Sequence, residues 1–190
     1  MLNFMCDKSA GGDRQKLLAI DNNTLTDLNV GECFNNCVNL NSVKFDSVTS
    51  VSGATIFYGC TNLESANFPQ LTQISGGSMF NGLSSLKTVN MPELITISGA
   101  YVFYNCTGLT SINMPKLKTL SNTQIFRGIG QVDINFPALE TISGNDTFNA
   151  SQIKSVNMPA LTTITGASTF YNNGYLTSVN MPKLTNINNG

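Results

Sequence analysis

The sequence of 190 residues contains no histidine and no tryptophan, and only 11% of its residues are charged. Without histidine the chain has no imidazole general base, no serine–histidine or cysteine–histidine nucleophile pair and no histidine metal ligand. A net charge of −1 leaves no basic patch for phosphates and no acidic run for cationic partners. We therefore expect a protein that is not an enzyme, has no cofactor or metal, and does not bind nucleic acid.

Long apolar segments are also missing. No stretch approaches the roughly 20 apolar residues that span a bilayer, so we expect no transmembrane segment. The opening residues, Met1 to Cys6, are apolar over too short a length for a secretory signal. The sequence therefore shows no signal peptide, and a cytoplasmic location stays open.

The six prolines recur at one phase of a repeating unit, at spacings of 23, 23, 22, 22 and 23 residues. They are Pro69, Pro92, Pro115, Pro137, Pro159 and Pro182. A constant period of this length indicates one short motif copied and stacked as a solenoid. Eight coils, the last incomplete, start near Leu18, Asn41, Glu64, Lys87, Thr110, Val132, Lys154 and Thr177. We expect an N-terminal cap or tail over residues 1–17 and a repeat domain over residues 18–190.

One coil illustrates the expected structure. Val89 and Met91 are separated by one residue, which is strand periodicity, and Pro92 ends the strand because it cannot donate a ladder hydrogen bond. A second inward pair, Leu94 and Ile97, precedes a Ser–Gly turn. A phenylalanine column should close the far wall: Phe57, Phe80, Phe103, Phe126, Phe148 and Phe170. Because 22–23 residues leave little room for a helix, we expect a β-dominated solenoid. It should have one parallel sheet of about 7–8 strands, with short second strands or 3₁₀ turns opposite.

The segments LTSINMP, LTTI and FYNCTGL resemble the leucine-rich repeats of the BspA-like surface proteins. The resemblance runs from about residue 18 to residue 190. The chain departs from the family by Met-Pro or Phe-Pro where the family has Ile-Pro, and by losing the repeat cysteine in several coils. The resemblance implies a right-handed α/β-type leucine-rich repeat solenoid from a bacterial or microbial protein. It also implies a cell-surface or secreted location, a role in adhesion and no catalytic residues.

The side chains between the inward strand positions should face solvent in two columns, one of hydroxyls and one of amides. We take them as the candidate binding surface: Ser65, Asn67, Thr88, Asn90, Ser111, Asn113, Asp133, Asn135, Ser155 and Asn157. Stacked asparagines can also hydrogen-bond to one another along the sheet, and the two interpretations are compatible. Neutral hydroxyls and amides suit a protein or glycan ligand of unknown identity. Ordering of water or ice is disfavoured, because these columns lack regular threonine spacing.

A secondary candidate surface contains the larger side chains that follow the core phenylalanines. It consists of Tyr58, Tyr104, Arg127 and Tyr171. Tyrosine and arginine are enriched at protein interfaces. Tyrosine after phenylalanine also belongs to the repeat pattern, however, where it can simply cover the edge of a coil.

Three cysteines, Cys37, Cys60 and Cys106, share a repeat position that leucine or isoleucine fills in other coils. This exchange predicts buried thiols. Cys37 and Cys60 belong to neighbouring coils, so a disulfide between them stays open. The odd total of five cysteines argues against a disulfide framework. Cys6 lies outside the repeat and is the thiol that we expect to be reactive.

Two functions follow from this pattern. The first is non-catalytic recognition at a cell surface, through adhesion or binding of a protein or glycan along the solenoid. The alternative is a structural solenoid that assembles through its C-terminal strand edge, because the eighth coil stops before its phenylalanine and lacks a polar cap.

Overall fold

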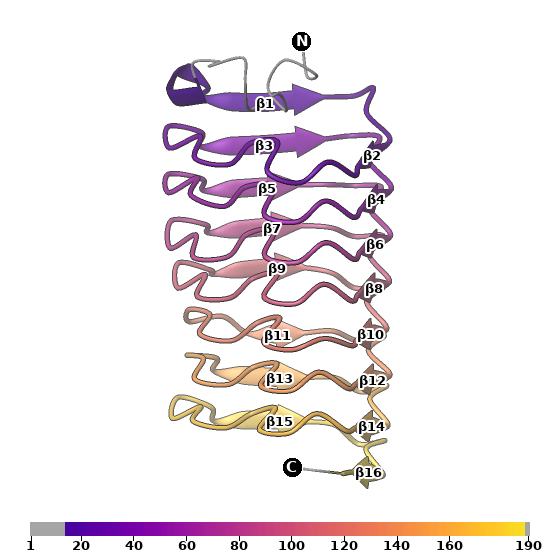
Figure 1. The fold of residues 1–190 in the computed structure, drawn as a ribbon. Coiled ribbons are helices and arrows are strands. Elements are labelled where there is room, and N and C mark those ends of the chain that lie inside the picture. Colours follow the sequence, from indigo (N-terminus) through magenta and orange to yellow (C-terminus); the bar gives the residue numbers. More distant parts are fainter. Residues whose placement is uncertain (1–13, 189–190) are drawn as a thin grey trace.

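Two sets of parallel strands line two neighbouring sides of a nearly straight stack of coils, with the shorter strands at the right-hand edge of the view (Figure 1). The structure is a computed structural model, and it describes residues 14–188. Each coil contributes one longer and one shorter strand, and the only helix in the described range is the 3₁₀ turn η2 (Arg14–Lys16). The expected β-dominated leucine-rich repeat solenoid is confirmed. Of the expected N-terminal cap or tail, only the last four residues lie in the described range.

The longer strands form the side that we name the long-strand face. They are β1 (Ala19–Asn22), β3 (Ser42–Phe45), β5 (Ser65–Asn67), β7 (Thr88–Asn90), β9 (Ser111–Asn113), β11 (Ile134–Asn135), β13 (Ser155–Asn157) and β15 (Ser178–Asn180). The shorter strands form the short-strand face. They are β2 (Asp27–Leu28), β4 (Ser50–Val51), β6 (Gln73–Ile74), β8 (Thr96–Ile97), β10 (Thr119–Leu120), β12 (Thr141–Ile142), β14 (Thr163–Ile164) and β16 (Asn186–Ile187).

All pairings are parallel and keep the repeat in register, so that Ala66 pairs with Val89 and Val89 with Ile112. The longer strands were expected to make one sheet, but they make two: β1-β3-β5-β7-β9 and β11-β13-β15. The shorter strands instead form one sheet of eight strands, in the order β2 to β16. The short-strand face is therefore the uninterrupted one.

The break between β9 and β11 coincides with a change in coil length. Nine residues separate Cys106 from Pro115 (115 − 106), whereas eight separate the equivalent Ile129 from Pro137 (137 − 129). Relative to the proline that follows each strand, β11 therefore begins one residue later than β9. Ile112 on β9 is consequently half-buried, while its counterparts in neighbouring coils are buried.

A continuous column of stacked phenylalanines occupies the core, as the sequence predicts. The ring centroids of Phe80 and Phe103 lie 5.3 Å apart, and those of Phe103 and Phe126 lie 5.0 Å apart with an interplanar angle of 3°. The column begins one coil earlier than expected, at Phe34, and ends at the half-buried Phe170. Because every ring is covered by the coils on either side, the core exists only between neighbours.

The glycines of the Ser–Gly pairs permit close contact between coils. A Cβ atom at Gly99 would lie 2.2 Å from the backbone oxygen of Gly76, and one at Gly166 would lie 2.0 Å from that of Gly144. The glycines with positive φ are others, namely Gly59, Gly82 and Gly128. The turn predicted at these pairs therefore needs glycine because backbone lies directly against it.

Candidate interaction surfaces

The ten residues of the first candidate surface all lie along the long-strand face. Nine belong to β5, β7, β9, β11 and β13, and Asp133 directly precedes β11. Their side chains are half-buried or exposed, and they alternate with the inward residues of each strand. The strand periodicity therefore assigned each of them to the correct side of the sheet.

The asparagines of this face form hydrogen-bonded ladders, which confirms that interpretation of the sequence. The Asn90 Nδ2 donates to Asn67 Oδ1 at 2.7 Å, and the Asn113 Nδ2 donates to Asn90 Oδ1 at 2.6 Å. A second ladder joins Asn135, Asn157 and Asn180 with two bonds of 2.7 Å. No amide bond joins Asn113 to Asn135, so the ladder stops where the sheet is split.

The hydroxyl column beside the asparagines has one hydrogen bond between side chains. The Ser155 Oγ donates to Asp133 Oδ1 at 2.7 Å. At the N-terminal end of the asparagine column stands Lys44, whose Nζ lies 2.6 Å from Asp46 and 3.6 Å from Asp21. The hydrogen bond with Asp46 raises the pKa of Lys44. The long-strand face therefore carries few charges, and many of its polar groups bond to one another.

The secondary candidate surface divides into separate parts. The Arg127 guanidinium lies 5.9 Å from the ring centroid of Tyr104, and Tyr101 packs edge-on against Tyr104 at 5.8 Å. Tyr58 and Tyr171 are each separated from this cluster by a coil that carries asparagine at the same position. The structure therefore brings Tyr104 and Arg127 together with Tyr101, and leaves the other two tyrosines apart.

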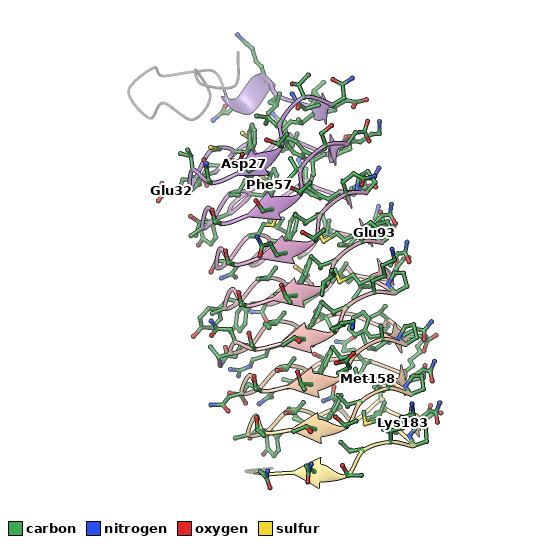
Figure 2. The ribbon with its side chains drawn as sticks, turned by 90° about the vertical axis from the view of Figure 1, so that its right-hand side faces the viewer. Asp27, Glu32, Phe57, Glu93, Met158 and Lys183 are labelled. Carbon is green, nitrogen blue, oxygen red and sulfur yellow. The ribbon has the colours of Figure 1, made fainter. Side chains whose placement is uncertain are left out.

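The short-strand face carries hydroxyl columns that the sequence analysis did not select. Thr96, Thr119, Thr141 and Thr163 occupy equivalent outward positions on paired strands. Two residues further along each coil lies a second outward column: Ser52, Ser75, Ser98, Ser121, Ser143 and Thr165. Figure 2 shows this face toward the viewer, with Asp27 at its N-terminal end. The recurring Thr-Ile-Ser and Thr-Leu-Ser segments of the sequence indicate these hydroxyl columns, but they were interpreted as a strand followed by a turn.

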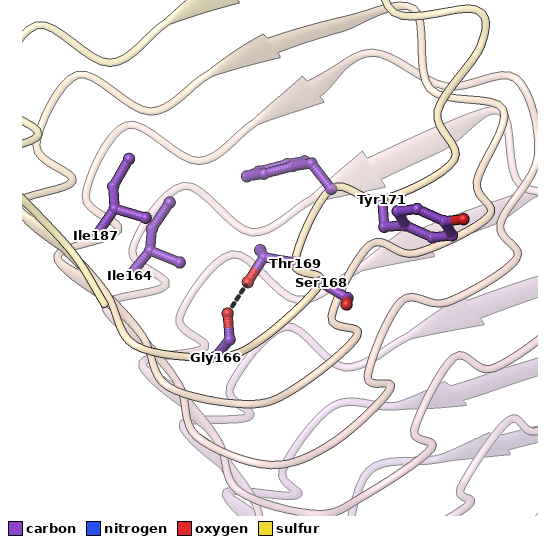
Figure 3. Close-up of a pocket in the computed structure, with 7 residues that line it drawn as sticks. Ile164, Gly166, Ser168, Thr169, Tyr171 and Ile187 are labelled. Carbon is purple, nitrogen blue, oxygen red and sulfur yellow. Dashed lines mark hydrogen bonds between the residues drawn. The ribbon is translucent and has the colours of Figure 1, made fainter. Parts of the chain in front are cut away.

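The last described coil leaves apolar residues uncovered. Val179 is 57% exposed and Ile187 is 62% exposed. A hollow of about 480 Å³ lies beside them, lined by Ile164, Gly166, Ser168, Thr169, Phe170, Tyr171 and Ile187. In Figure 3 the two isoleucines lie side by side, and the Thr169 hydroxyl donates to the Gly166 carbonyl at 2.8 Å.

The repeat cysteines are buried and form no disulfide, so Cys37 and Cys60 are not bridged to each other. Burial raises the pKa of the Cys106 thiol to about 12. Cys33 is disulfide-bonded, which the odd cysteine count did not lead us to expect. The reactive thiol predicted at Cys6 lies outside the described residues. Within residues 14–188, no cluster of three or more histidine, cysteine, aspartate or glutamate side chains is arranged to hold a metal ion.

The shared cysteine position has a structural role in hydrogen bonding. The Cys106 thiol donates to the Phe80 carbonyl of the preceding coil at 3.0 Å, as Cys60 does to Phe34. In later coils Ser151 takes this position and donates to Phe126 at 2.9 Å. Small polar side chains are therefore accepted here because each can donate to a carbonyl beside the phenylalanine column.

The chain belongs to the BspA-type leucine-rich repeat family. The family model, described as a BspA-type leucine-rich repeat region of six copies, matches residues 20–131 and 99–190. Members of this family are typically surface-associated in bacteria and typically non-enzymatic, and they serve as recognition or protein-interaction modules. Within the described part of the chain, no helical segment has the length and hydropathy of a membrane span.

Two solved structures match this chain, and one of them has a TM-score above 0.5. The crystal structure of a leucine-rich repeat protein of T. pallidum matches with a TM-score of 0.57 and 20% identity, over 86% of this chain and 69% of that one. A leucine-rich repeat protein of Bacteroides ovatus matches with a TM-score of 0.38 and 18% identity, over 92% of this chain and 63% of that one. A search of curated protein sequences finds no match. The first structure supports the solenoid fold and says nothing of a ligand.

Proposed function

We propose that this chain is a non-catalytic recognition module that binds a protein or glycan ligand at the bacterial cell surface, through the long-strand face. The observation that carries the proposal is the asparagine ladder. Each amide uses at most one N–H and one oxygen lone pair within the ladder and keeps at least one donor and one acceptor for a ligand. Because the ladder holds the amides in one orientation, a ligand meets polar groups whose conformational freedom is already lost.

The Tyr101–Tyr104–Arg127 cluster supports the same function from the edge of the coils. Aromatic and guanidinium groups are the side chains that most often dominate binding energy at protein interfaces. The cluster lies on the same two coils as Asn90 and Asn113. A ligand large enough to wrap one side of the solenoid would therefore contact both.

The test is an array of extracellular-matrix proteins and glycans probed with the wild-type chain and with the variant Asn90→Ala/Asn113→Ala. Loss of the bound signal with an unchanged circular dichroism spectrum supports the long-strand face. Binding that survives this variant but is lost with Arg127→Ala moves the site to the aromatic cluster. An empty array contradicts recognition as the function.

Assembly is a second candidate, and the exposed apolar residues of the last described coil favour it. Each internal coil covers equivalents of Ile187 and Val179 with the next coil. A second copy of the chain would bury them by pairing a strand with the open edges of β15 and β16. We expect such an assembly to depend on concentration and to be lost in Val179→Lys/Ile187→Lys. A single monomeric species of the wild-type chain at high concentration in sedimentation velocity would contradict it.

A further inference from the structure

The short-strand face differs from the long-strand face in what its polar groups contact. The hydroxyls of Thr96, Thr119 and Thr141 have no hydrogen bond to any described residue, and the hydroxyl of Thr163 has only a 3.4 Å contact with Thr162. The serine hydroxyls of the neighbouring column, such as Ser98, are likewise without side-chain hydrogen bonds in the described range. On the long-strand face the amides bond to one another instead. The short-strand face therefore presents two neighbouring columns of hydroxyl groups that can bond to a ligand.

This face is also the more regular of the two. It runs without interruption through eight strands, whereas the other side is split after β9. Parallel strands place equivalent hydroxyls about 4.8 Å apart along the axis, and the two columns about 6.6 Å apart across each coil. The result is a flat, rigid, two-dimensional array of hydroxyl groups.

From β8 to β14 the array is uncharged and contains no aromatic side chain, and Gln73 and Asp27 take the threonine position only on β6 and β2. Its nearest charged groups form an ion pair at the flank, where Lys118 Nζ lies 3.2 Å from Glu140 Oε1. A second pair, Lys116 with Glu93, lies further toward the proline turns at 2.6 Å. In Figure 2 the labelled Glu93 and Lys183 stand to the side of the short strands. A ligand of this face is thus not recognised through charge.

A periodic array discriminates in favour of a ligand with a matching period. A pyranose ring is about as long as the spacing between parallel strands, so a linear sugar chain along the axis meets one hydroxyl row per sugar. Hydroxyl groups both donate and accept, as sugar hydroxyls do, and the threonine methyl groups suit the C–H faces of the rings. We propose that the short-strand face binds a linear, uncharged polysaccharide of β-linked pyranoses, laid along the solenoid axis with one sugar over each coil.

This inference rests on the recognition function proposed above but assigns a different face and a defined ligand class. The test measures binding of the full chain to insoluble cellulose, chitin, xylan and mannan, and then to soluble oligosaccharides of the polymer that binds. The variant is Thr119→Val/Thr141→Val, which keeps the β-branched shape and removes two hydroxyls. The matched control is Thr61→Val/Thr107→Val, two exposed threonines that lie outside both strand faces and whose hydroxyls have no side-chain hydrogen bond to a described residue.

The expected result is binding that strengthens with each added sugar, because every coil offers the same contact. The short-strand variant should weaken binding about tenfold, as the loss of two hydrogen bonds implies, while the control binds like the wild type. Failure with all four polymers overturns the inference, and so does equal loss in the control. Ice shaping that depends on Thr119 and Thr141, without polymer binding, also overturns it by identifying an ice lattice as the ligand. The proposed function is judged separately, by the Asn90→Ala/Asn113→Ala variant.

Discussion

The glycines of the coil stack allow steric contact and backbone conformation to be separated within one chain. Gly99 lies against backbone without a positive φ, since an added Cβ would be 2.2 Å from the Gly76 oxygen. Gly82 has a φ of +76° and no atom within 4 Å of an added Cβ. Gly174 has neither restriction. Substitution of each by alanine therefore tests a different physical cost.

The expected cost at Gly99 follows from the geometry of the stack. Ordinary contacts of a Cβ begin at 3.4 Å, so the coils must separate locally by about 1 Å. Backbone hydrogen bonds of 2.8 Å and 3.3 Å from Ser98 and Gly99 to the Ile74 carbonyl oppose that movement. Overpacking with one weakened hydrogen bond should lower the free energy of unfolding by about 3 kcal/mol. Gly82→Ala should lower it by about 1 kcal/mol because of its left-handed backbone, and Gly174→Ala should change it by less than about 0.5 kcal/mol.

Urea denaturation followed by circular dichroism measures the three differences under the same conditions. Asn122 takes the equivalent position in the next coil, where its Nδ2 donates to the Ser98 carbonyl at 2.8 Å. Asparagine at position 99 would still place a Cβ atom 2.2 Å from the Gly76 oxygen, so Gly99→Asn should also be destabilising. If Gly99→Ala were no more destabilising than Gly174→Ala, the glycines would not be required by the coil contact.

Three further predictions concern the core and the ladder. Phe103→Ala should lower the free energy of unfolding by about 4 kcal/mol, and Phe170→Ala by less than half of that. The reason is that Phe103 is stacked on both sides, whereas Phe170 is half-buried. Equal losses for the two variants in urea denaturation would contradict a stabilising phenylalanine column. Asn90→Ala should be about twice as destabilising as Asn113→Ala, since Asn90 makes two ladder bonds and Asn113 one. The raised pKa of Cys106 keeps its thiol neutral in the folded state, so stability should fall as the pH rises from about 9 toward 12, with an added loss of up to about 1.4 kcal/mol per pH unit. Urea denaturation at several pH values in this range should show that Cys106→Ser removes the added loss of stability. An unchanged pH dependence in that variant would refute the role of the Cys106 thiol.

The sequence predicted the repeat and its inward side chains because both depend on local spacing. The pair Val89 and Met91 is buried, and the phenylalanine column is stacked, as the strand periodicity and the shared phase indicated. Contacts of this kind occur between residues one repeat apart, so one period predicts all of them. The same reasoning placed the asparagines on the outward side of the long strands.

Other features depend on three-dimensional detail that spacing does not contain. The split after β9 coincides with one residue fewer between Ile129 and Pro137, but the opposite change between the coils of β13 and β15 leaves those strands paired, so the spacing alone does not predict the split. The glycine of each Ser–Gly pair looked like a turn residue because the approach of the neighbouring coil cannot be seen in one dimension. The hydroxyl columns of the short-strand face were missed because the segment that contains Thr96 and Ser98 was interpreted only as a short strand and a turn, without regard to its outward side chains.

The length of a polar side chain explains why the two faces differ. In register, equivalent atoms of neighbouring coils are about 4.8 Å apart, which is too far for one hydroxyl to reach the next. An asparagine amide places its donor and acceptor at separate atoms, so the gap closes with bonds of 2.6 Å and 2.7 Å. The exception supports this reasoning, because Ser155 finds a partner only where Asp133 offers a longer carboxylate. Asparagine columns therefore stabilise the stack, whereas threonine and serine columns at the same spacing remain open to a ligand.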